Sequence, residues 1–316
     1  MSGPGAVTIG ETMVLVSSLI EEPLQHSKQM ALGIGGAESN VAIGLRRLGT
    51  EVTWVGKIGN DSAGDLVERE LRAEGLQVFS IRDPDAPTAL MIKERRSAAE
   101  TRVWYYRSGN AGSRLGIDNL DPSLISRATL LHMTGITPAL SASARDMTLE
   151  AIRIARSANV PVSFDLNYRR GLWTRDAAAE FYQKVIPETD ILFAGDDEAA
   201  IAVGTAASPE ELAQRLVELG AGQAIIKLGA NGALALAGGK ITTQKAIPVT
   251  VRDTVGAGDA FVAGYLSDYL AGEPIERCMA TAVQVGAYAC MAAGDWEGLP
   301  RRSELHALTA SEPVSR

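Results

Sequence analysis

Residues 253–261, Asp-Thr-Val-Gly-Ala-Gly-Asp-Ala-Phe, are the most informative stretch of the chain. A run of small residues leads directly into a segment whose apolar residues recur at helical spacing, which predicts a helix over 259–270. Small residues at the start of a helix leave backbone N–H groups exposed, and the helix dipole favours negative charge there. We therefore predict an anion-binding turn at residues 256–258.

Asp259 lies beside this turn, in the first turn of the predicted helix. A carboxylate there can accept the proton of a hydroxyl that attacks a phosphorus atom, and an unperturbed Asp, with a pKa of about 3.9, is ionised at neutral pH. The alternative is that Asp259 only complements the helix dipole and that the glycines only make a tight turn. Neither alternative explains why Gly256, Gly258 and Asp259 stand together at the start of a helix.

Along the rest of the chain, short β-rich runs alternate with amphipathic helical stretches. Several of the runs are continuously apolar, which is typical of strands covered on both faces. The alternation predicts an α/β fold of three layers, with a mostly parallel central sheet between two layers of helices. The expected strands cover residues 7–11, 51–56, 128–134, 161–167, 191–194 and 224–227. The expected helices cover residues 39–48, 63–73, 142–158, 176–185, 209–219, 259–270 and 275–292.

Residues 88–94 and 101–107 break this alternation, because two β-rich runs joined by a charged turn predict a hairpin. The irregular segment 15–30 can pair with this hairpin. We expect residues of about 12–34 and 86–109 to form a small β lid inserted in a single domain spanning 1–316. A lid can exclude water from a reacting phosphate. The alternative is a hairpin that extends the edge of the main sheet.

The composition of the chain argues against some classes of binding partner. The formal net charge of −8 repels nucleic acid and anionic membrane surfaces, so neither is an expected partner. No apolar run approaches the roughly 20 residues that span a bilayer, and residues 1–6 do not resemble a secretion signal. Cys278 and Cys290 fit buried thiols in a reducing compartment. We expect a cytoplasmic protein that gathers positive charge locally if its substrates are anions.

Residues 253–259 resemble the C-terminal signature of the ribokinase-like (PfkB) carbohydrate kinases, and residues 35–49, which begin Gly-Gly-Ala-Glu-Ser-Asn, resemble their N-terminal signature. The resemblance extends over nearly the whole chain, from about residue 7 to 308. It implies the ribokinase-like fold, with ATP and Mg²⁺ as cofactors, and it allows a monovalent cation and a homo-oligomer. It also implies that Gly256, Ala257 and Gly258 form an anion hole and that Asp259 is the catalytic base.

Within the family, the chain is most similar to the subgroup that phosphorylates the sugar acid 2-keto-3-deoxygluconate on its primary hydroxyl. The similarity lies in residues 36–40, 105–107, 165–169 and 294–298. The substrate contacts that it implies are Gly35, Gly36, Ala37, Glu38, Ser39, Asn40, Tyr105, Tyr106, Arg107, Arg169, Asp259 and Asp295. The nucleotide contacts that it implies are Asn167, Arg169, Lys227, Gly229, Asn231, Gly232, Gly256 and Gly258.

The chemistry of these residues partly supports the resemblance. The guanidinium groups of Arg107 and Arg169 suit a carboxylate or phosphate, although either could be an ordinary surface charge. Tyr105 and Tyr106 point to opposite faces of a strand, so at most one faces the substrate; the expected mechanism places Tyr106 there. The segment 227–232 follows a strand and could equally be a plain Asn-Gly turn.

Two positions depart from the family pattern. Gly195 stands where the family carries an Asn that helps organise Mg²⁺, which leaves Glu198 as the candidate metal residue. Met91 stands where a Tyr would contact the sugar acid, and Met cannot donate a hydrogen bond in its place.

Three other functions remain open at this point. A kinase of a neutral sugar such as fructose or ribose would use the same fold. A nucleotide-dependent oxidoreductase lacks support, because the chain has no G-x-G-x-x-G sequence. A non-catalytic sugar-binding protein with this fold would have no need of Asp259.

Overall fold

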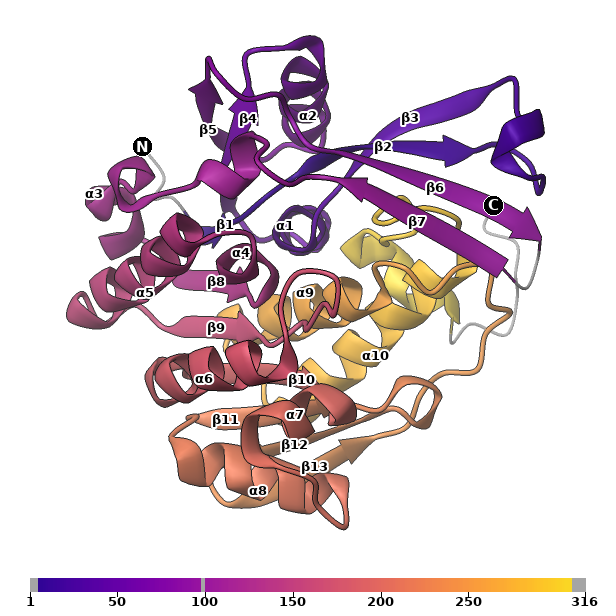
Figure 1. Ribbon diagram of the computed structural model, residues 1–316. Helices are drawn as coiled ribbons and strands as arrows, with labels where there is room; N and C mark the ends of the chain where they lie inside the picture. Colours follow the sequence, from indigo (N-terminus) through magenta and orange to yellow (C-terminus); the bar gives the residue numbers. More distant parts are fainter. Residues whose placement is uncertain (1–4, 98–99, 309–316) are drawn as a thin grey trace.

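The central sheet has nine strands within the part of the chain that this computed structural model describes, residues 5–97 and 100–308. Its order is β13-β12-β11-β10-β9-β8-β1-β4-β5 (Figure 1). Neighbouring strands from β5 to β11 are parallel, whereas β12 and β13 are added antiparallel. The strands are β1 (Ala6–Ile9), β4 (Val52–Gly59), β5 (Gln77–Asp83), β8 (Leu130–Thr134), β9 (Val162–Asp165), β10 (Ile191–Gly195), β11 (Gln223–Lys227), β12 (Ala233–Ala237) and β13 (Lys240–Gln244).

Helices cover both faces of this sheet, as the alternating pattern predicts (Figure 1). One face packs on α3 (Pro122–Ser126), α4 (Ile136–Ala139), α5 (Ala142–Ser157), α6 (Arg175–Val185), α7 (Asp196–Val203) and α8 (Pro209–Leu219). The other face packs on α1 (Ala37–Arg47), α2 (Ser62–Ala73), α9 (Ala257–Leu270) and α10 (Ile275–Met291). Each central strand contributes side chains to the hydrophobic cores on both faces of the sheet, because successive side chains point to opposite faces. In β10, Ile191 and Phe193 join the α9 side, whereas Leu192 and Ala194 join the α5 side.

The helices begin and end where capping chemistry predicts. The side chain of Ser208 accepts the N–H of Glu211 at the start of α8. Gly49, Gly75 and Gly220 follow the ends of α1, α2 and α8 with positive φ angles, in the conformation that favours glycine after a helix. The sequence analysis missed strands β5, β12 and β13 and the short helices α3, α4 and α7. Strand β5 escaped it because its charged and partly exposed residues lack an apolar run.

The predicted hairpin is β6 (Leu90–Ser97) with β7 (Glu100–Tyr106), and it belongs to a separate small sheet of order β3-β2-β6-β7 within the described residues. Segment 15–30, which the sequence analysis left irregular, contains most of β2 (Met13–Ser18) and leads into β3 (Met30–Gly35). Strand β2 pairs parallel with β6. The hairpin therefore does not extend the edge of the main sheet; Figure 1 shows the small sheet projecting away from it.

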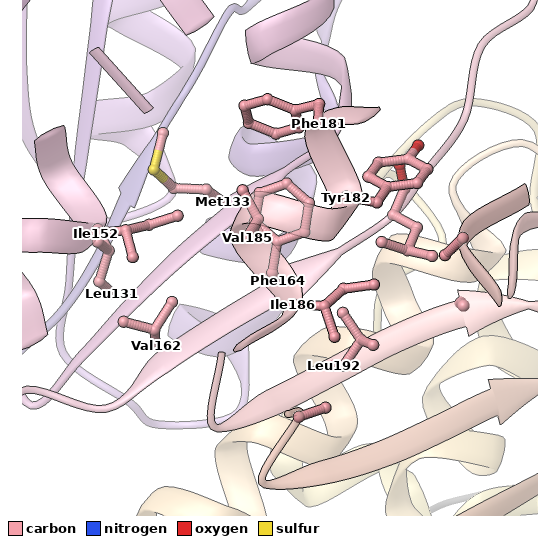
Figure 2. Close-up of a cluster of buried hydrophobic side chains, with 14 of the residues drawn as sticks. Leu131, Met133, Ile152, Val162, Phe164, Phe181, Tyr182, Val185, Ile186 and Leu192 are labelled. Atoms are coloured by element: carbon pink, nitrogen blue, oxygen red, sulfur yellow. The ribbon is translucent and has the colours of Figure 1, made fainter. Parts of the chain in front are cut away.

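An aromatic and aliphatic cluster fixes the middle of the main sheet against α5 and α6 (Figure 2). Phe164 of β9 and Phe181 of α6 lie with their ring centroids 6.4 Å apart, and both are buried. Leu131 and Met133 of β8 extend the same layer. This packing fixes the positions of the carboxyl ends of β9 and β10.

We expect Phe164→Ala to lower the free energy of unfolding by about 3–5 kcal/mol, because it removes a ring from a fully buried cluster. Urea denaturation measures the loss. Phe79→Ala on the edge strand β5 is the matched control, since that ring is 43% exposed and should cost much less. Equal losses in the two variants would contradict the packing described here.

Candidate active site

A cavity of about 450 Å³ opens where the small sheet faces the carboxyl edge of the main sheet. Its lining comes from segments far apart in sequence. The small sheet contributes Met13, Met91 and Tyr105, and Arg107 directly follows its strand β7. The start of α1 contributes Gly36, Ala37 and Asn40, and the loop after β9 contributes 169–172. The start of α9, with Asp295 nearby, forms the floor. Doubly wound folds place ligands at this edge of the sheet.

Asp259 lies on the cavity floor in the first turn of α9. The side-chain amide of Asn40 donates a hydrogen bond of 2.8 Å to its Oδ2 and so fixes the orientation of the carboxylate. Burial raises the pKa of Asp259 to about 7, against the lowering effect of the Asn40 bond. A carboxyl group with such a pKa can change protonation state at neutral pH, which suits a general base.

The turn before Asp259 has the geometry of an anion site. Gly256 caps α9 with a φ of +77°, and a Cβ atom at this position would overlap the backbone carbonyl of Asp295. The N–H of Ala257 makes a long hydrogen bond of 3.3 Å to the carbonyl of Thr254. The next N–H groups, at Gly258 and Asp259, belong to the first turn of the helix, where N–H groups have no partner four residues back.

Lys227, at the end of β11, adds a fixed positive charge near this turn. Its Nζ lies 3.7 Å from where a Cβ of Gly258 would be, and it bonds both oxygens of Asp165 at 2.6 and 2.8 Å. Burial opposes the charged form, but the carboxylates of Asp165 and Glu198 raise the pKa of Lys227 overall, so it stays protonated. The helix start and Lys227 together can hold a phosphoryl group.

Two arginines reach the cavity from different elements. Arg169 follows β9 and is exposed at the cavity wall, and its charge helps to lower the pKa of Asp259. Arg107 follows β7, is largely buried and forms an ion pair of 2.5 Å with Glu11. Its Nε is buried without a hydrogen-bond partner among the described residues, so one donor of the guanidinium is left over. Burial raises the pKa of Glu11, and Arg107 opposes that effect.

Some predicted substrate contacts are placed differently. Glu38 and Ser39 are fully buried on α1 and are not among the residues that line the cavity, so their role as sugar contacts stays a prediction. Glu38 turns into the core, where Thr134 and Thr137 donate to its Oε1 at 2.8 and 2.6 Å, and Ser39 donates to the carbonyl of Gly36. Successive side chains of a helix point in different directions around its axis, so the residues of a motif at its start cannot all face the same ligand.

Tyr105 lines the cavity and lies under the guanidinium of Arg107, at 5.6 Å from ring centroid to Cζ. Tyr106 points to the other face of β7, is 57% exposed and is not part of the lining. At most one of the two tyrosines was expected to face the substrate. The structure places Tyr105 in that position, where the sequence analysis had preferred Tyr106.

Four of the predicted nucleotide residues do not line this cavity: Asn167, Gly229, Asn231 and Gly232. Asn167 is buried just after β9 with a left-handed φ of +39°. Gly229, Asn231 and Gly232 make the turn between β11 and β12. A Cβ at Gly232 would overlap the carbonyl of Gln244, so the plain-turn interpretation accounts for that glycine. Nucleotide contact by these residues stays a prediction.

Glu198 caps the start of α7. It accepts the N–H of Gly195 at 2.7 Å and that of Tyr168 at 3.0 Å. In residues 5–97 and 100–308, no group of three or more His, Cys, Asp or Glu side chains is placed to hold a metal ion. A metal-binding role for Glu198 therefore stays a prediction. Its two hydrogen bonds show that this side chain also stabilises the start of α7.

The sequence analysis missed two charged residues of the site, Glu11 and Lys93. Glu11 pairs with Arg107, and Lys93 is buried on β6 against Asp253 and Asp295. One signal could have found Lys93. It stands two positions after Met91 in a predicted strand, and residues two apart share a face of a strand.

Comparisons with known proteins agree with this geometry. Residues 5–302 match the description of the pfkB family of carbohydrate kinases. The chain is 35% identical over 311 residues to the 2-dehydro-3-deoxygluconokinase of Bacillus subtilis, covering 97% of this chain and 96% of that one. It is 33% identical over 276 residues to the 2-dehydro-3-deoxygalactonokinase of Haloferax volcanii, covering 87% of each.

A solved structure shares the fold. The fructokinase of Xylella fastidiosa, crystallised with bound ATP, superposes with a TM-score of 0.83 at 26% sequence identity, covering 96% of this chain and 97% of that one. The relatives thus include proteins named for acidic and for neutral sugars. Within the described residues, no helix is both long and apolar enough to cross a membrane.

We expect Gly256→Ala to destabilise the protein by at least about 1–3 kcal/mol, the cost of a left-handed non-glycine backbone, because the overlap with Asp295 adds to it. Gly258→Ala is the matched control: the position is helical and the nearest atom would lie 3.7 Å away, so its stability should change by less than about 1 kcal/mol. Urea denaturation compares them. Equal stability of the two variants would show that the turn does not need its glycine.

Proposed function

The chain belongs to the PfkB family of carbohydrate kinases, and we propose that it transfers the γ-phosphoryl group of ATP to the primary hydroxyl of 2-keto-3-deoxygluconate (2-dehydro-3-deoxygluconate), giving the 6-phosphate. The observation that carries this proposal is a single cavity that has Asp259 at its floor, an anion-binding helix start beside it, and Arg107 and Arg169 in its wall. Family membership argues against the oxidoreductase alternative, and Asp259 held by Asn40 argues against a non-catalytic protein.

Asp259 acts as the base in the proposed reaction. The sugar hydroxyl donates its proton to the carboxylate while its oxygen attacks the γ-phosphorus. The N–H groups at the start of α9 and the charges of Lys227 and Arg169 stabilise the negative charge of the moving phosphoryl group. Mg²⁺ bound to the phosphates would supply further neutralisation, and Glu198 is the residue that we propose faces it.

The acidic end of the sugar lies against Arg107 in this proposal. The guanidinium of Arg107, which lines the cavity and pairs with Glu11, is the donor for the substrate carboxylate, with Tyr105 beside it. The Glu11–Arg107 pair is also the observation that favours the second candidate, a kinase of a neutral sugar, because it leaves little net positive charge at this wall. The same pair thus supplies a direct test.

We also propose that the protein is a cytoplasmic homo-oligomer. The support for an oligomer is the outer surface of the small sheet, where Leu32, Trp104 and Tyr106 expose large apolar surfaces. Size-exclusion chromatography with light scattering measures the assembly directly.

Replacing the base should stop turnover while leaving binding nearly intact. We expect Asp259→Asn to lower kcat by about 10²–10⁴-fold with little change in KM for the sugar, since a general base acts in the transition state. In the wild type, kcat/KM should fall as the pH drops below about 7, because the protonated carboxyl cannot accept a proton. Near-native turnover by Asp259→Asn would overturn the assignment of the base.

Removing the arginine should separate the two candidate substrates. The double variant Arg107→Met with Glu11→Gln removes the pair without leaving a buried charge unpaired. We expect kcat/KM for the keto acid to fall by about 10–100-fold, the value of a charged hydrogen bond, with a much smaller change for fructose. Arg102→Met on the same strand, paired with Glu100 at the surface, is the control. An equal loss for both sugars would contradict the acid pocket.

A further inference from the structure

Lys93 is the most deeply buried lysine side chain of the cavity region, and the proposed chemistry makes no use of it. It lies on β6, its side chain is 4% exposed, and it shares the inward face of that strand with Met91. A lysine is rarely buried to this degree unless it is paired. Its partners therefore indicate what holds the small sheet in place.

Both partners lie far away in the sequence. The Nζ of Lys93 is 2.5 Å from Oδ2 of Asp253 and 3.5 Å from Oδ1 of Asp295. Asp253 opens the turn that leads to Asp259, and its other oxygen accepts the N–H of Val255 at 3.1 Å. One carboxylate thus holds the ammonium of the small sheet and the backbone of the anion-binding turn together.

Asp295 connects to the same turn from the other side. Its backbone carbonyl packs where a side chain of Gly256 would be, and its carboxylate lies against Gly35 at the end of β3. Burial raises the pKa of Asp295 to about 6, while Lys93 opposes this. Two buried carboxylates beside each other would repel in the absence of a cation, so the ammonium is needed to hold them close.

We propose that Lys93 is a positioning residue for phosphoryl transfer. Its ammonium fixes Asp253 and Asp295, and through them it sets the turn at 254–258 and docks the small sheet over the cavity. The inference rests on the proposed function and deepens it, because the turn matters for turnover only if it holds the transferred group. It also means that the chain supplies the cation between these carboxylates, so turnover should need no added monovalent cation there.

The test replaces the ammonium and then returns one from solution. We expect Lys93→Met to lower kcat by about 100-fold, the effect of a small misplacement of reacting groups, with the KM values changed far less. Ammonium or methylammonium chloride, which can enter between the freed carboxylates, should restore a large part of kcat in the variant at fixed ionic strength. Wild-type activity should not respond to these salts. Thermal unfolding curves, recorded with each salt, identify an assay temperature at which each variant is folded.

Two further variants keep the result decisive. Lys57→Met breaks another partly buried ion pair, 3.4 Å from Asp83 and outside the cavity, and should keep its kcat without responding to ammonium. Lys93→Met combined with Asp253→Asn removes one charge of each sign and so keeps the net charge of the cluster; it should fold even if the single variant does not, and it should keep a low kcat that ammonium fails to restore.

The outcomes separate the two proposals. A wild type that phosphorylates no sugar acid contradicts the proposed function. An active wild type contradicts the role of Lys93 if folded Lys93→Met keeps kcat within about threefold, if no cation restores a lost kcat, or if the double variant turns over at the wild-type rate.

Discussion

The site depends on one close approach, that of the backbone at Gly256 to the carbonyl of Asp295. The contact leaves no room for a Cβ atom, and the chain there takes a left-handed conformation that glycine adopts freely. From that point α9 begins, which directs its first N–H groups toward the cavity and puts Asp259 beside them. The anion site and the base are therefore produced by the same turn, and neither can move without the other.

Buried charge is the second constraint, and the chain balances it in pairs. Lys227 neutralises Asp165, Arg107 neutralises Glu11, and Lys93 lies between Asp253 and Asp295. Each pair joins two elements, because an unpaired buried charge would cost several kcal/mol. Asp259 differs from these carboxylates: it accepts a hydrogen bond from the neutral amide of Asn40, and burial raises its pKa to about 7. The pairs keep the surroundings fixed, and the base remains free to take up a proton.

Much of the architecture was predictable from the sequence, since apolar runs and helix caps are local signals. The parallel sheet, its two helix layers and the β6–β7 hairpin followed from such signals. Strands β12 and β13 were missed although a plain turn at Asn231-Gly232 was considered, because β12 is mostly alanine and β13 is polar and largely exposed. The glycines and Asp259 of the anion turn were found because small residues before a helix are recognisable in any chain.

The side-chain partners could not be predicted in the same way. Glu38 lies within a motif, but only the helix phase shows that it turns toward Thr134 and Thr137. Lys93 and Asp295 are 202 positions apart, so their pairing comes from the docking of the small sheet against the segment that follows α10. The choice between Tyr105 and Tyr106 needed the orientation of β7, which the sequence pattern of a polar lid does not give.

The central claim is that this cavity phosphorylates a sugar acid on its primary hydroxyl. The most direct test is ATP consumption by the purified protein with Mg²⁺ and 2-keto-3-deoxygluconate, with fructose and ribose in parallel and the product examined by ³¹P NMR. The account predicts a clear preference for the keto acid and a phosphate ester on its terminal carbon. Preferential turnover of fructose or ribose would contradict the assignment of the acid pocket at Arg107.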